Sequence, residues 1–290
     1  MKPMKTDPMK RFLKQHPFLV EAERIHRLVD EAVGTPEPIR LPERAVAKTL
    51  AEKLPILQQA TYKSRMVRAV YMMQEEVFAR IAEAEVPPLM QESAREYLAV
   101  LKKLRKAAKE EFIIAVLTQD KEAFAALCEQ HALNEGFIRS TTWRMIAALV
   151  PAELKNPDGW NPDRDKPRFR ENFCPVCGRR PVLAELRKYR EGRTRDLVCG
   201  GCDTRWLYAR VGCVYCGNEN LEKMHTLEPT DSDLMRLDIC DECNSYIKTY
   251  RGPVGGSPAD VIYRQDWASV HLDLLAEEKG LHKKGNPILE

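Results

Sequence analysis

Four Cys-x-x-Cys pairs dominate the chemistry that this sequence can offer. Two residues between paired cysteines let one tight turn present both sulfurs to the same ion, and two such pairs about 20 residues apart are typical of a tetrahedral thiolate site. Here 21 residues separate the first two pairs and 23 separate the last two, but only 10 lie between the second pair and the third. The spacing therefore predicts two metal sites, one after the other. Their predicted ligands are Cys174, Cys177, Cys199 and Cys202 in the first site, and Cys213, Cys216, Cys240 and Cys243 in the second.

The residues that follow each pair repeat in the same order. Gly178 and Gly217 follow the first pair of each site, and Asp203 and Asn244 follow the second pair. Glycine permits a positive φ, which allows backbone N–H groups to turn toward the sulfurs, and Asp and Asn also tolerate such turns. The repeated order predicts two copies of one unit, each a rubredoxin-like or zinc-ribbon site.

The residue types leave the metal and its role open. Iron and zinc both accept four thiolates in a tetrahedron. Units of about 40 residues are too small to rely on a hydrophobic core alone, so the metals could simply hold them together. Eight thiolate ligands leave no open position for substrate, which argues against a hydrolytic metal enzyme. Redox-active dithiols are the alternative, but they require each pair at a helix N-terminus after a strand, and the spacing favours tetrathiolate sites.

Three other residues of ligand type are not predicted to bind metal. Cys128 and His131 share a helix face but supply only two donors, and a lone cysteine is commonly a buried core residue. His271 lies in a predicted C-terminal helix, and the cysteines already complete both sites. The sequence contains no P-loop, dinucleotide fingerprint, nucleophile elbow or zinc-protease motif. We therefore expect a protein that is not an enzyme.

The first 150 residues carry the periodicity of helices. Apolar side chains recur every three or four residues from Met66 to Ile81, and again from Met90 to Ala108 after the breaks at Pro87 and Pro88. Further helices are expected over residues 121–133 and 135–150, and between residues 42 and 60 with an interruption at Pro55. This pattern predicts an α-helical bundle.

A change in composition and periodicity marks the end of the predicted bundle. Residues 150–170 are rich in Pro, Asn, Asp and Gly without helical periodicity, which is typical of a linker, and Trp160 is expected to fix it to a neighbouring surface. Strands are expected at 181–186 and 234–239, and a final helix at 259–278 with Trp267, Val270, Leu274 and Leu275 turned inward. The predicted class is α+β, with a helical domain and linker at 1–170, a first rubredoxin-like subdomain at 171–212, and a second at 213–290 that includes the C-terminal helix.

The composition indicates the compartment in which the protein is expected to act and the kind of partner that it is expected to bind. The 290-residue chain has a net charge of +3, with 44% hydrophobic and 31% charged residues. It has no signal-peptide pattern and no apolar run near the ~20 residues that cross a bilayer, so we expect a cytoplasmic protein without membrane insertion. The charge is +5 over residues 1–170 and −2 over 171–290, and each divalent ion with four thiolates adds a formal −2. We therefore expect an acidic surface that would suit a basic partner, with Asp231, Asp233, Asp238, Asp241 and Glu242 contributing to it.

The whole pattern resembles the FdhE family of formate dehydrogenase accessory proteins. The resemblance rests on the helical N-terminal region, the four ordered pairs, Thr204-Arg205-Trp206, Tyr246-Ile247-Lys248 and the closing segment from Leu272 to Gly280. It implies a cytoplasmic factor for the assembly of an active formate dehydrogenase that is exported by the twin-arginine route. It further implies binding to the catalytic subunit before export, and two rubredoxin-like iron sites held by the eight paired cysteines.

Two functions from other classes remain open on the residues alone. Many zinc ribbons bind DNA or RNA, but the near-neutral charge and the acidic second half argue against a nucleic-acid partner. A thiol oxidoreductase is the other, and reactivity of the cysteines in the metal-loaded protein would distinguish it from a tetrathiolate protein.

Overall fold

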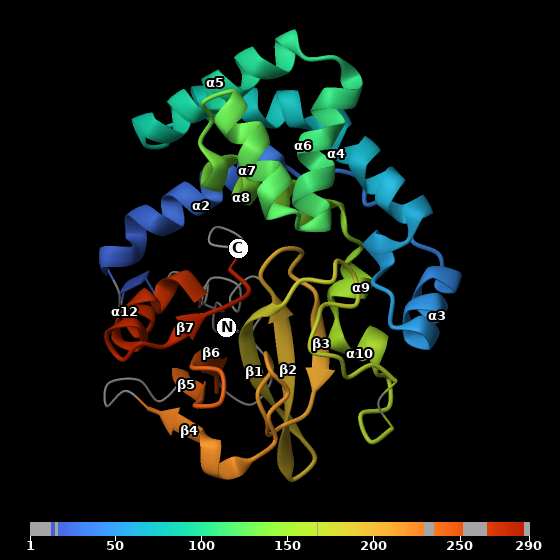
Figure 1. Ribbon diagram of the computed structural model, residues 1–290, viewed down its shortest axis with the longest axis vertical. Coiled ribbons are helices and arrows are strands. Elements are labelled where there is room, and N and C mark those ends of the chain that lie inside the picture. Colours follow the sequence, from blue (N-terminus) through green and yellow to red (C-terminus); the bar gives the residue numbers. More distant parts are fainter. Residues whose placement is uncertain (1–12, 15–16, 167, 229–234, 252–265, 287–290) are drawn as a thin grey trace, which may run out of the picture.

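The computed structural model describes residues 13–14, 17–166, 168–228, 235–251 and 266–286. Helices gather at one end of the molecule and a sheet at the other, with a C-terminal helix beside the sheet (Figure 1). This arrangement confirms the predicted α+β class. The helical part contains η1 (Pro17–Leu19), α2 (Val20–Val33), α3 (Glu43–Glu52), η2 (Ile56–Gln58), α4 (Ala60–Glu83), α5 (Pro88–Lys103), α6 (Lys106–Thr118), α7 (Lys121–Gln130), α8 (Glu135–Leu149), α9 (Ala152–Lys155) and α10 (Pro157–Trp160).

Helix α4 is the centre of the helical region and packs against α2, α5, α6 and α8. Its predicted apolar stripe is buried at Met66, Val70, Val77 and Ile81, whereas Met73 is half-buried. The prediction of one helix from Met90 to Ala108 was wrong, because the chain leaves helical geometry at Leu104 (ψ 145°) and Arg105 (ψ 159°). This break turns the chain so that α6 packs back against α4.

Capping residues mark the starts of the next two helices. The carboxylate of Asp120 accepts a hydrogen bond from the Ala123 N–H at 3.0 Å, and the side chain of Asn134 accepts one from the Phe137 N–H at 3.1 Å. Helices α7 and α8 thus begin where the sequence predicted. Cys128 lies buried in the core on α7, and burial raises the pKa of its thiol to about 11.

The linker folds against its neighbours. It forms the short helices α9 and α10, and the fully buried Trp160 indole donates a hydrogen bond to the Leu154 carbonyl at 2.8 Å. The side chain of Asn161 closes the following loop, because it donates to the Phe169 carbonyl at 2.8 Å and accepts from the Phe169 N–H at 2.9 Å. Trp160 also belongs to the core that the helical region shares with the sheet, and α10 packs against β3, so the expected anchoring is confirmed.

One sheet of seven strands runs through both cysteine-bearing regions. Its order is β3-β2-β1-β6-β5-β4, and β7 pairs with β6. The hairpin of β1 and β2 and the hairpin of β5 and β6 are antiparallel, and they join through a parallel pairing of β1 with β6 that sets Leu183 opposite Lys248. The strands are β1 (Pro181–Tyr189), β2 (Gly192–Cys199), β3 (Arg205–Tyr208), β4 (Met224–Leu227), β5 (Met235–Cys240), β6 (Ser245–Tyr250) and β7 (His282–Lys283), with η3 (Leu221–Lys223) before β4.

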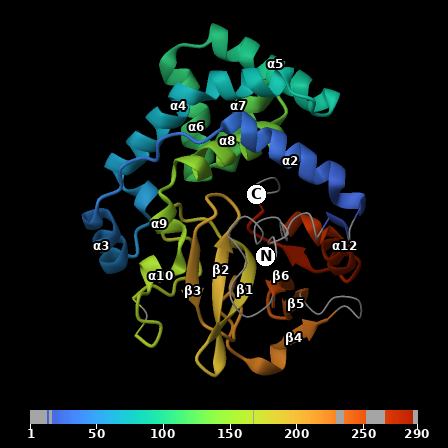
Figure 2. The same ribbon diagram turned by 180° about the vertical axis from the view of Figure 1, so that it is seen from behind.

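The C-terminal helix α12 (Val270–Glu278) lies beside the sheet and next to α2 in both views (Figures 1 and 2). The predicted residues 259–265 lie outside the described part of the chain. The predicted inward face was wrong for Val270 and Leu274, which are exposed, whereas Trp267 and Leu275 are half-buried. The fully buried residues of this helix are Leu272 and Ala276. Ser269, with φ −108° and ψ 31°, interrupts the helical geometry just before α12 and shifts the buried face.

Candidate metal centres

The first predicted set of cysteines converges in a fully buried cluster. Cys174 and Cys177 lie in the loop before β1, Cys199 ends β2, and Cys202 lies in the turn toward β3. Their four sulfurs all lie within 4.8 Å of one another, with 3.5 Å between Cys174 and Cys202 and 3.4 Å between Cys177 and Cys199. All four residues are buried.

These distances fit a metal site better than a disulfide. Four sulfurs at about 2.3 Å from one ion would lie roughly 3.8 Å apart in a tetrahedron, whereas a disulfide brings two sulfurs to about 2.05 Å. All eight paired cysteines are free thiols in the structure. Zinc and iron both suit this donor set, so the arrangement leaves the identity of the metal open.

Backbone N–H groups support the sulfurs, as the turn residues predicted. The N–H groups of Gly201 and Cys202 point at the Cys199 sulfur, at 3.3 and 3.5 Å. Gly178 and Asp203 adopt positive φ of 83° and 61° in the two turns of this cluster. Such donors hold part of the charge of a thiolate and orient it.

The thiols of the first cluster differ in acidity. Burial raises the pKa of Cys174 and of Cys177 well above the ordinary range. Burial also acts to raise the pKa of Cys199, but hydrogen bonds from the other three thiols and from the Cys202 N–H outweigh it and lower that pKa well below the ordinary range. Since metals bind thiolates, loading this cluster would release protons from Cys174 and Cys177.

The helical region packs against the first cluster through Ile56 and Leu57 of η2, a contact surface that we call the helical seat. The N–H groups of Ile56 and Leu57 in η2 donate to the carbonyls of Pro175 and Val176, at 3.0 and 2.8 Å. The same hydrophobic core contains the α4 stripe and these four cysteines. The first cluster is therefore part of the interface between helices and sheet.

Gly178 and Gly201 allow the helical region to lie close to the loops of the first cluster, because neither carries a side chain. A Cβ on Gly178 would lie 2.4 Å from Nε2 of Gln58, and a Cβ on Gly201 would lie 2.7 Å from Cε3 of Trp143. Sequence reasoning missed Gln58 and Trp143, because nothing in their local pattern distinguishes them from ordinary helix residues.

The second predicted set also converges, but at the surface. Cys213 and Cys216 precede η3, Cys240 ends β5, and Cys243 lies in the turn to β6. These sulfurs too lie within 4.8 Å of one another, with 3.6 Å between Cys213 and Cys243 and 3.8 Å between Cys216 and Cys240. Cys213 and Cys240 are buried, whereas Cys243 is only partly covered and Cys216 is exposed.

Local contacts repeat those of the first cluster. The Tyr215 N–H points at the Cys213 sulfur at 3.4 Å, and Gly217 and Asn244 adopt positive φ of 75° and 48°. Burial raises the pKa of Cys213 to about 12. The Cys243 pKa is lowered, because hydrogen bonds from Ser245 and the other thiols outweigh burial. In each cluster the sulfur distances given above join the first cysteine to the fourth and the second to the third, which fits two copies of one unit.

The surface near the second cluster is less acidic than expected. The prediction was wrong for Asp238, which is buried, accepts a hydrogen bond from Thr249 at 2.7 Å and pairs with Arg236 at 2.8 Å. Asp241 pairs with His225, and Glu242 pairs with Lys223. Asp231 and Asp233 lie outside the described residues. Each described carboxylate of this set thus has a neighbouring polar or charged partner.

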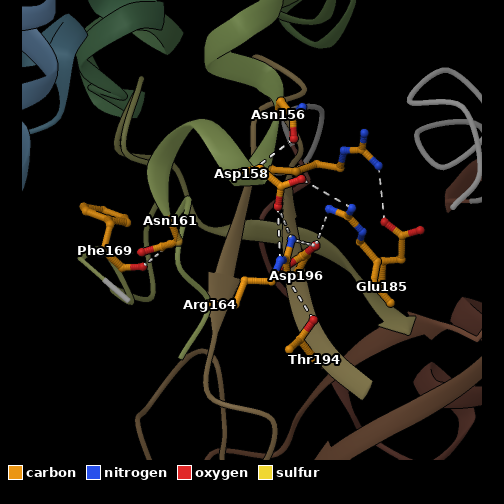
Figure 3. A network of polar contacts seen from close by, with 10 residues as sticks. Asn156, Asp158, Asn161, Arg164, Phe169, Glu185, Thr194 and Asp196 are labelled. Carbon is orange, nitrogen blue, oxygen red and sulfur yellow. Dashed lines mark hydrogen bonds and ion pairs between the residues drawn. The ribbon is translucent and has the colours of Figure 1, made fainter. Parts of the chain in front are cut away.

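A buried polar network holds the β1–β2 hairpin, which carries Cys199, to the linker (Figure 3). Asp196 is fully buried and accepts two hydrogen bonds from Arg164, at 2.8 and 3.0 Å, and one from Arg187 at 3.2 Å. Arg164 also bonds Asp158 of α10, at 2.9 Å. The linker is therefore fastened to the strand that positions the first cluster.

The remaining residues of ligand type lie apart from both clusters. Among the described residues, the groups able to hold a metal contain the eight paired cysteines and do not contain Cys128, His131 or His271. His131 follows the last residue of α7, with its ring 6.1 Å from that of Phe112, and His271 is exposed on α12. No helix in the described ranges is long and apolar enough to cross a bilayer.

Fold and site together define a protein with two four-cysteine clusters on a shared sheet, one of them seated against a helical region. The family described as "FdhE, central domain" matches residues 173–210, which contain the first cluster. Sequence relatives include a "Protein FdhE homolog" of Aquifex aeolicus, 36% identical over 117 residues (40% of this chain, 41% of the relative), and "Protein FdhE" of Escherichia coli, 28% identical over 211 residues (71% and 62%). The chain is thus similar to FdhE proteins in sequence, most specifically over the region of the first cluster.

The similarity to FdhE proteins is also seen in the fold. The crystal structure of the FdhE protein from Pseudomonas aeruginosa superimposes with a TM-score of 0.60 over 97% of this chain and 90% of that one, at 18% identity. At this identity the likeness concerns the fold. The sequence matches span between 39% and 62% of the length of the first relatives.

Proposed function

We propose that this protein is an accessory factor for the assembly of a formate dehydrogenase, and that each four-cysteine cluster binds one metal ion. The observation that carries the proposal is the convergence of two complete sets of four sulfurs in a chain that is similar to FdhE proteins. The eight paired cysteines are the metal ligands in this proposal, and iron is the metal, with zinc as the alternative occupant. The protein acts in the cytoplasm and is not itself an enzyme.

The role of each residue in this proposal follows from the contacts. The paired cysteines bind the ion as thiolates, and the N–H groups of Gly201, Cys202 and Tyr215 orient the sulfurs. The bound metal supplies a cross-link between each pair of turns and, with iron, a one-electron redox centre. The η2 contacts with Pro175 and Val176 cover the first cluster, whereas the second cluster is accessible to solvent at the exposed Cys216.

Metal content tests the first half of the proposal. The chain purified under anaerobic conditions should contain two ions, and ferric tetrathiolate sites should absorb visible light whereas zinc sites should be colourless. A variant with all eight paired cysteines changed to serine should contain none. Cys128→Ala is the matched control, since it removes a cysteine outside both clusters, and it should retain both ions. Wild-type chain without metal under these conditions would contradict the proposal.

The partner in this proposal is the catalytic subunit of a formate dehydrogenase that is exported by the twin-arginine route. Co-purification with the tagged catalytic subunit from cells that cannot export it should recover this chain. Expression in a strain that lacks its own FdhE should restore formate oxidation. Full restoration by the eight-serine variant would show that metal is not needed for the role, and failure of the wild-type chain to bind the subunit would overturn the proposed partner.

Thiol titration separates this proposal from a thiol oxidoreductase. In the loaded protein the paired cysteines should resist an alkylating reagent such as iodoacetamide, and removal of metal should expose them. Stoichiometric reaction of a Cys-x-x-Cys pair in the loaded protein would favour dithiol redox chemistry instead.

A further inference from the structure

A cleft of about 340 Å³ lies between the helical region and the C-terminal segment, outside both cysteine clusters. Helix α2 contributes Ile25 and Val29 to its wall, α8 contributes Phe137 and Trp143, and Trp267 precedes α12. The cleft's size is in the range of about 300–1,000 Å³ that is usual for ligand sites. Figures 1 and 2 show one end of α2 next to α12.

Two donors in the cleft wall lack acceptors. The indole Nε1 atoms of Trp143 and Trp267 are buried and have no hydrogen-bond partner among the residues that the structure describes. Trp143 as a whole is only 1% exposed, the Arg179 guanidinium lies over its ring at 5.0 Å from the centroid, and Gly201 lies next to the ring. Buried polar groups in native proteins are almost always hydrogen-bonded, so two unsatisfied donors in one cleft point to a missing acceptor.

The charged groups of the wall are already paired with one another. Asp30 pairs with Arg144 at 2.8 Å, and Lys283 pairs with Asp266 and Asp273 at 2.7 and 3.0 Å. The ligand therefore needs no charge of its own. A neutral body with carbonyl acceptors matches the apolar wall and the two indole donors.

The apolar surface continues beyond the cleft. Val270 lines the cleft and is 48% exposed, and Leu274 lies one turn further along α12 and is exposed as well. His26 on α2 stacks on Trp267, with ring centroids 5.1 Å apart, and so forms part of the floor between the two helices. A chain segment can use both the enclosed cleft and the exposed strip, whereas a small molecule can use only the former.

We propose that this cleft binds a short, uncharged, apolar peptide segment of a partner protein. Backbone carbonyls of the segment accept hydrogen bonds from the Trp143 and Trp267 indoles, and its apolar side chains pack between α2 and α8. Gly200 and Gly201, which separate Cys199 from Cys202, also line the cleft. A bound segment thus lies against the loop of the first cluster.

Fluorescence anisotropy with a defined peptide tests the proposal on the full-length, metal-loaded chain. The probe is a fluorescein-labelled decapeptide of alternating leucine and glycine with blocked ends, and the comparison is the same peptide with serine in place of leucine. The leucine peptide should bind saturably and the serine peptide should not. N-acetyl-leucinamide should compete only at far higher concentration than the unlabelled leucine peptide.

Two matched valine substitutions localise the binding. Val270→Lys places a charge at the cleft, whereas Val211→Lys makes the same change at a valine that is 53% exposed and outside the cleft. Val270→Lys should weaken binding at least about tenfold, since a charge must lose its hydration to enter an apolar site, and Val211→Lys should leave it unchanged. Trp267→Phe keeps an aromatic ring but removes the donor, and should weaken binding by about fivefold. Melting curves equal to that of the wild-type chain show that each variant is folded.

Four outcomes would overturn the proposal. They are an absence of saturable binding by the leucine peptide, equal binding by the Val270→Lys and Val211→Lys variants, competition by N-acetyl-leucinamide as strong as by the peptide, and a stable homodimer in sedimentation that Val270→Lys dissociates. The third result would assign the cleft to a small molecule, and the fourth would assign it to a second copy of the chain. None of these outcomes depends on the identity of the proposed partner.

Discussion

Metal release from the two clusters is expected to occur on two separate time scales. All four cysteines of the first cluster are buried, whereas the second cluster exposes Cys216. A chelator can therefore begin ligand exchange at Cys216 in the folded protein. At the first cluster it must wait for a local opening that separates the loop before β1 from the helical region.

The contacts of that loop set the size of the difference. Opening breaks the hydrogen bonds from Ile56 and Leu57 to Pro175 and Val176, which contribute about 0.5–1.5 kcal/mol each. It also exposes the fully buried Val176 side chain, at about 1.5–3 kcal/mol. An opening cost of roughly 4 kcal/mol lowers the release rate about a thousandfold.

The assay mixes the loaded protein with an excess of a chromophoric chelator and follows absorbance from milliseconds to hours. Each phase should release one equivalent of metal. Cys216→Ser should abolish or accelerate the fast phase alone. A single phase of two equivalents, or a fast phase that survives unchanged in Cys216→Ser, would refute the reasoning from burial.

Two corresponding glycines provide a matched control for the helical seat. Gly178 and Gly217 occupy the same place in their clusters, with φ of 83° and 75°. Alanine is strained at both, but the new Cβ at Gly178 would also meet Gln58 (2.4 Å) and Pro55 (3.1 Å). At Gly217, among the residues that the structure describes and apart from its chain neighbours, no atom lies within 4 Å of the Cβ position. Gly178→Ala should accelerate the slow phase, and Gly217→Ala should leave it unchanged. Equal effects of both substitutions on the slow phase would mean that the seat does not control access.

Three further perturbations test the packing and charge of the structure by urea unfolding. Gly201→Ala should destabilise the protein by about 1–3 kcal/mol, because its Cβ would lie 2.7 Å from the Trp143 ring; an unchanged midpoint would contradict this packing. Asp196→Asn should cost about 3–5 kcal/mol, since it removes the buried counter-charge of Arg164 and Arg187 and leaves them only the half-exposed Asp158. Asp165→Asn at an exposed pair should cost less than about 1 kcal/mol, and similar losses would rule out the network as a stabilising element. Burial acts to raise the pKa of Asp266, but Lys248 and Lys283 outweigh it and hold that pKa below the ordinary value of 3.8. The carboxylate therefore stabilises the fold at neutral pH, and this stabilisation is lost as the pH falls below 3.8. Asp266→Asn should flatten this part of the plot of stability against pH, and parallel plots for the variant and the wild-type chain would exclude the contribution.

The convergence of each set of sulfurs was predictable because it depends on short-range geometry. Two residues between paired cysteines give one tight turn, and Gly178 and Asp203 supply the positive φ that such turns require. The repeated order of Gly217 and Asn244 then indicated which pairs belong together. For the same reason the capped starts of α7 and α8 agree with the sequence, since a cap is a contact across only three residues.

Features that depend on distant partners were not predictable in this way. The break at Leu104 lies within an unbroken apolar rhythm, so periodicity alone extends the helix through it. The parallel pairing of β1 with β6 has no local signal either, because the alternation of side chains is the same in both orientations. The cleft donors Trp143 and Trp267 read in the sequence only as large apolar residues.

The two clusters show how far identical motifs can differ once a fold surrounds them. Their spacing, turn residues and sulfur distances correspond, yet the helices cover one cluster and leave the other at the surface. A metal in the first cluster would cross-link loops that also belong to the core shared with α4, so its loss would loosen the attachment of the helices to the sheet. Of the second cluster, Cys213 and Cys240 belong to the same core, but Cys216 is exposed and Cys243 is only partly covered. Exchange of a metal there would therefore loosen the attachment less. The same donor chemistry therefore suits a permanent structural role at the first cluster and exchange with an outside partner at the second.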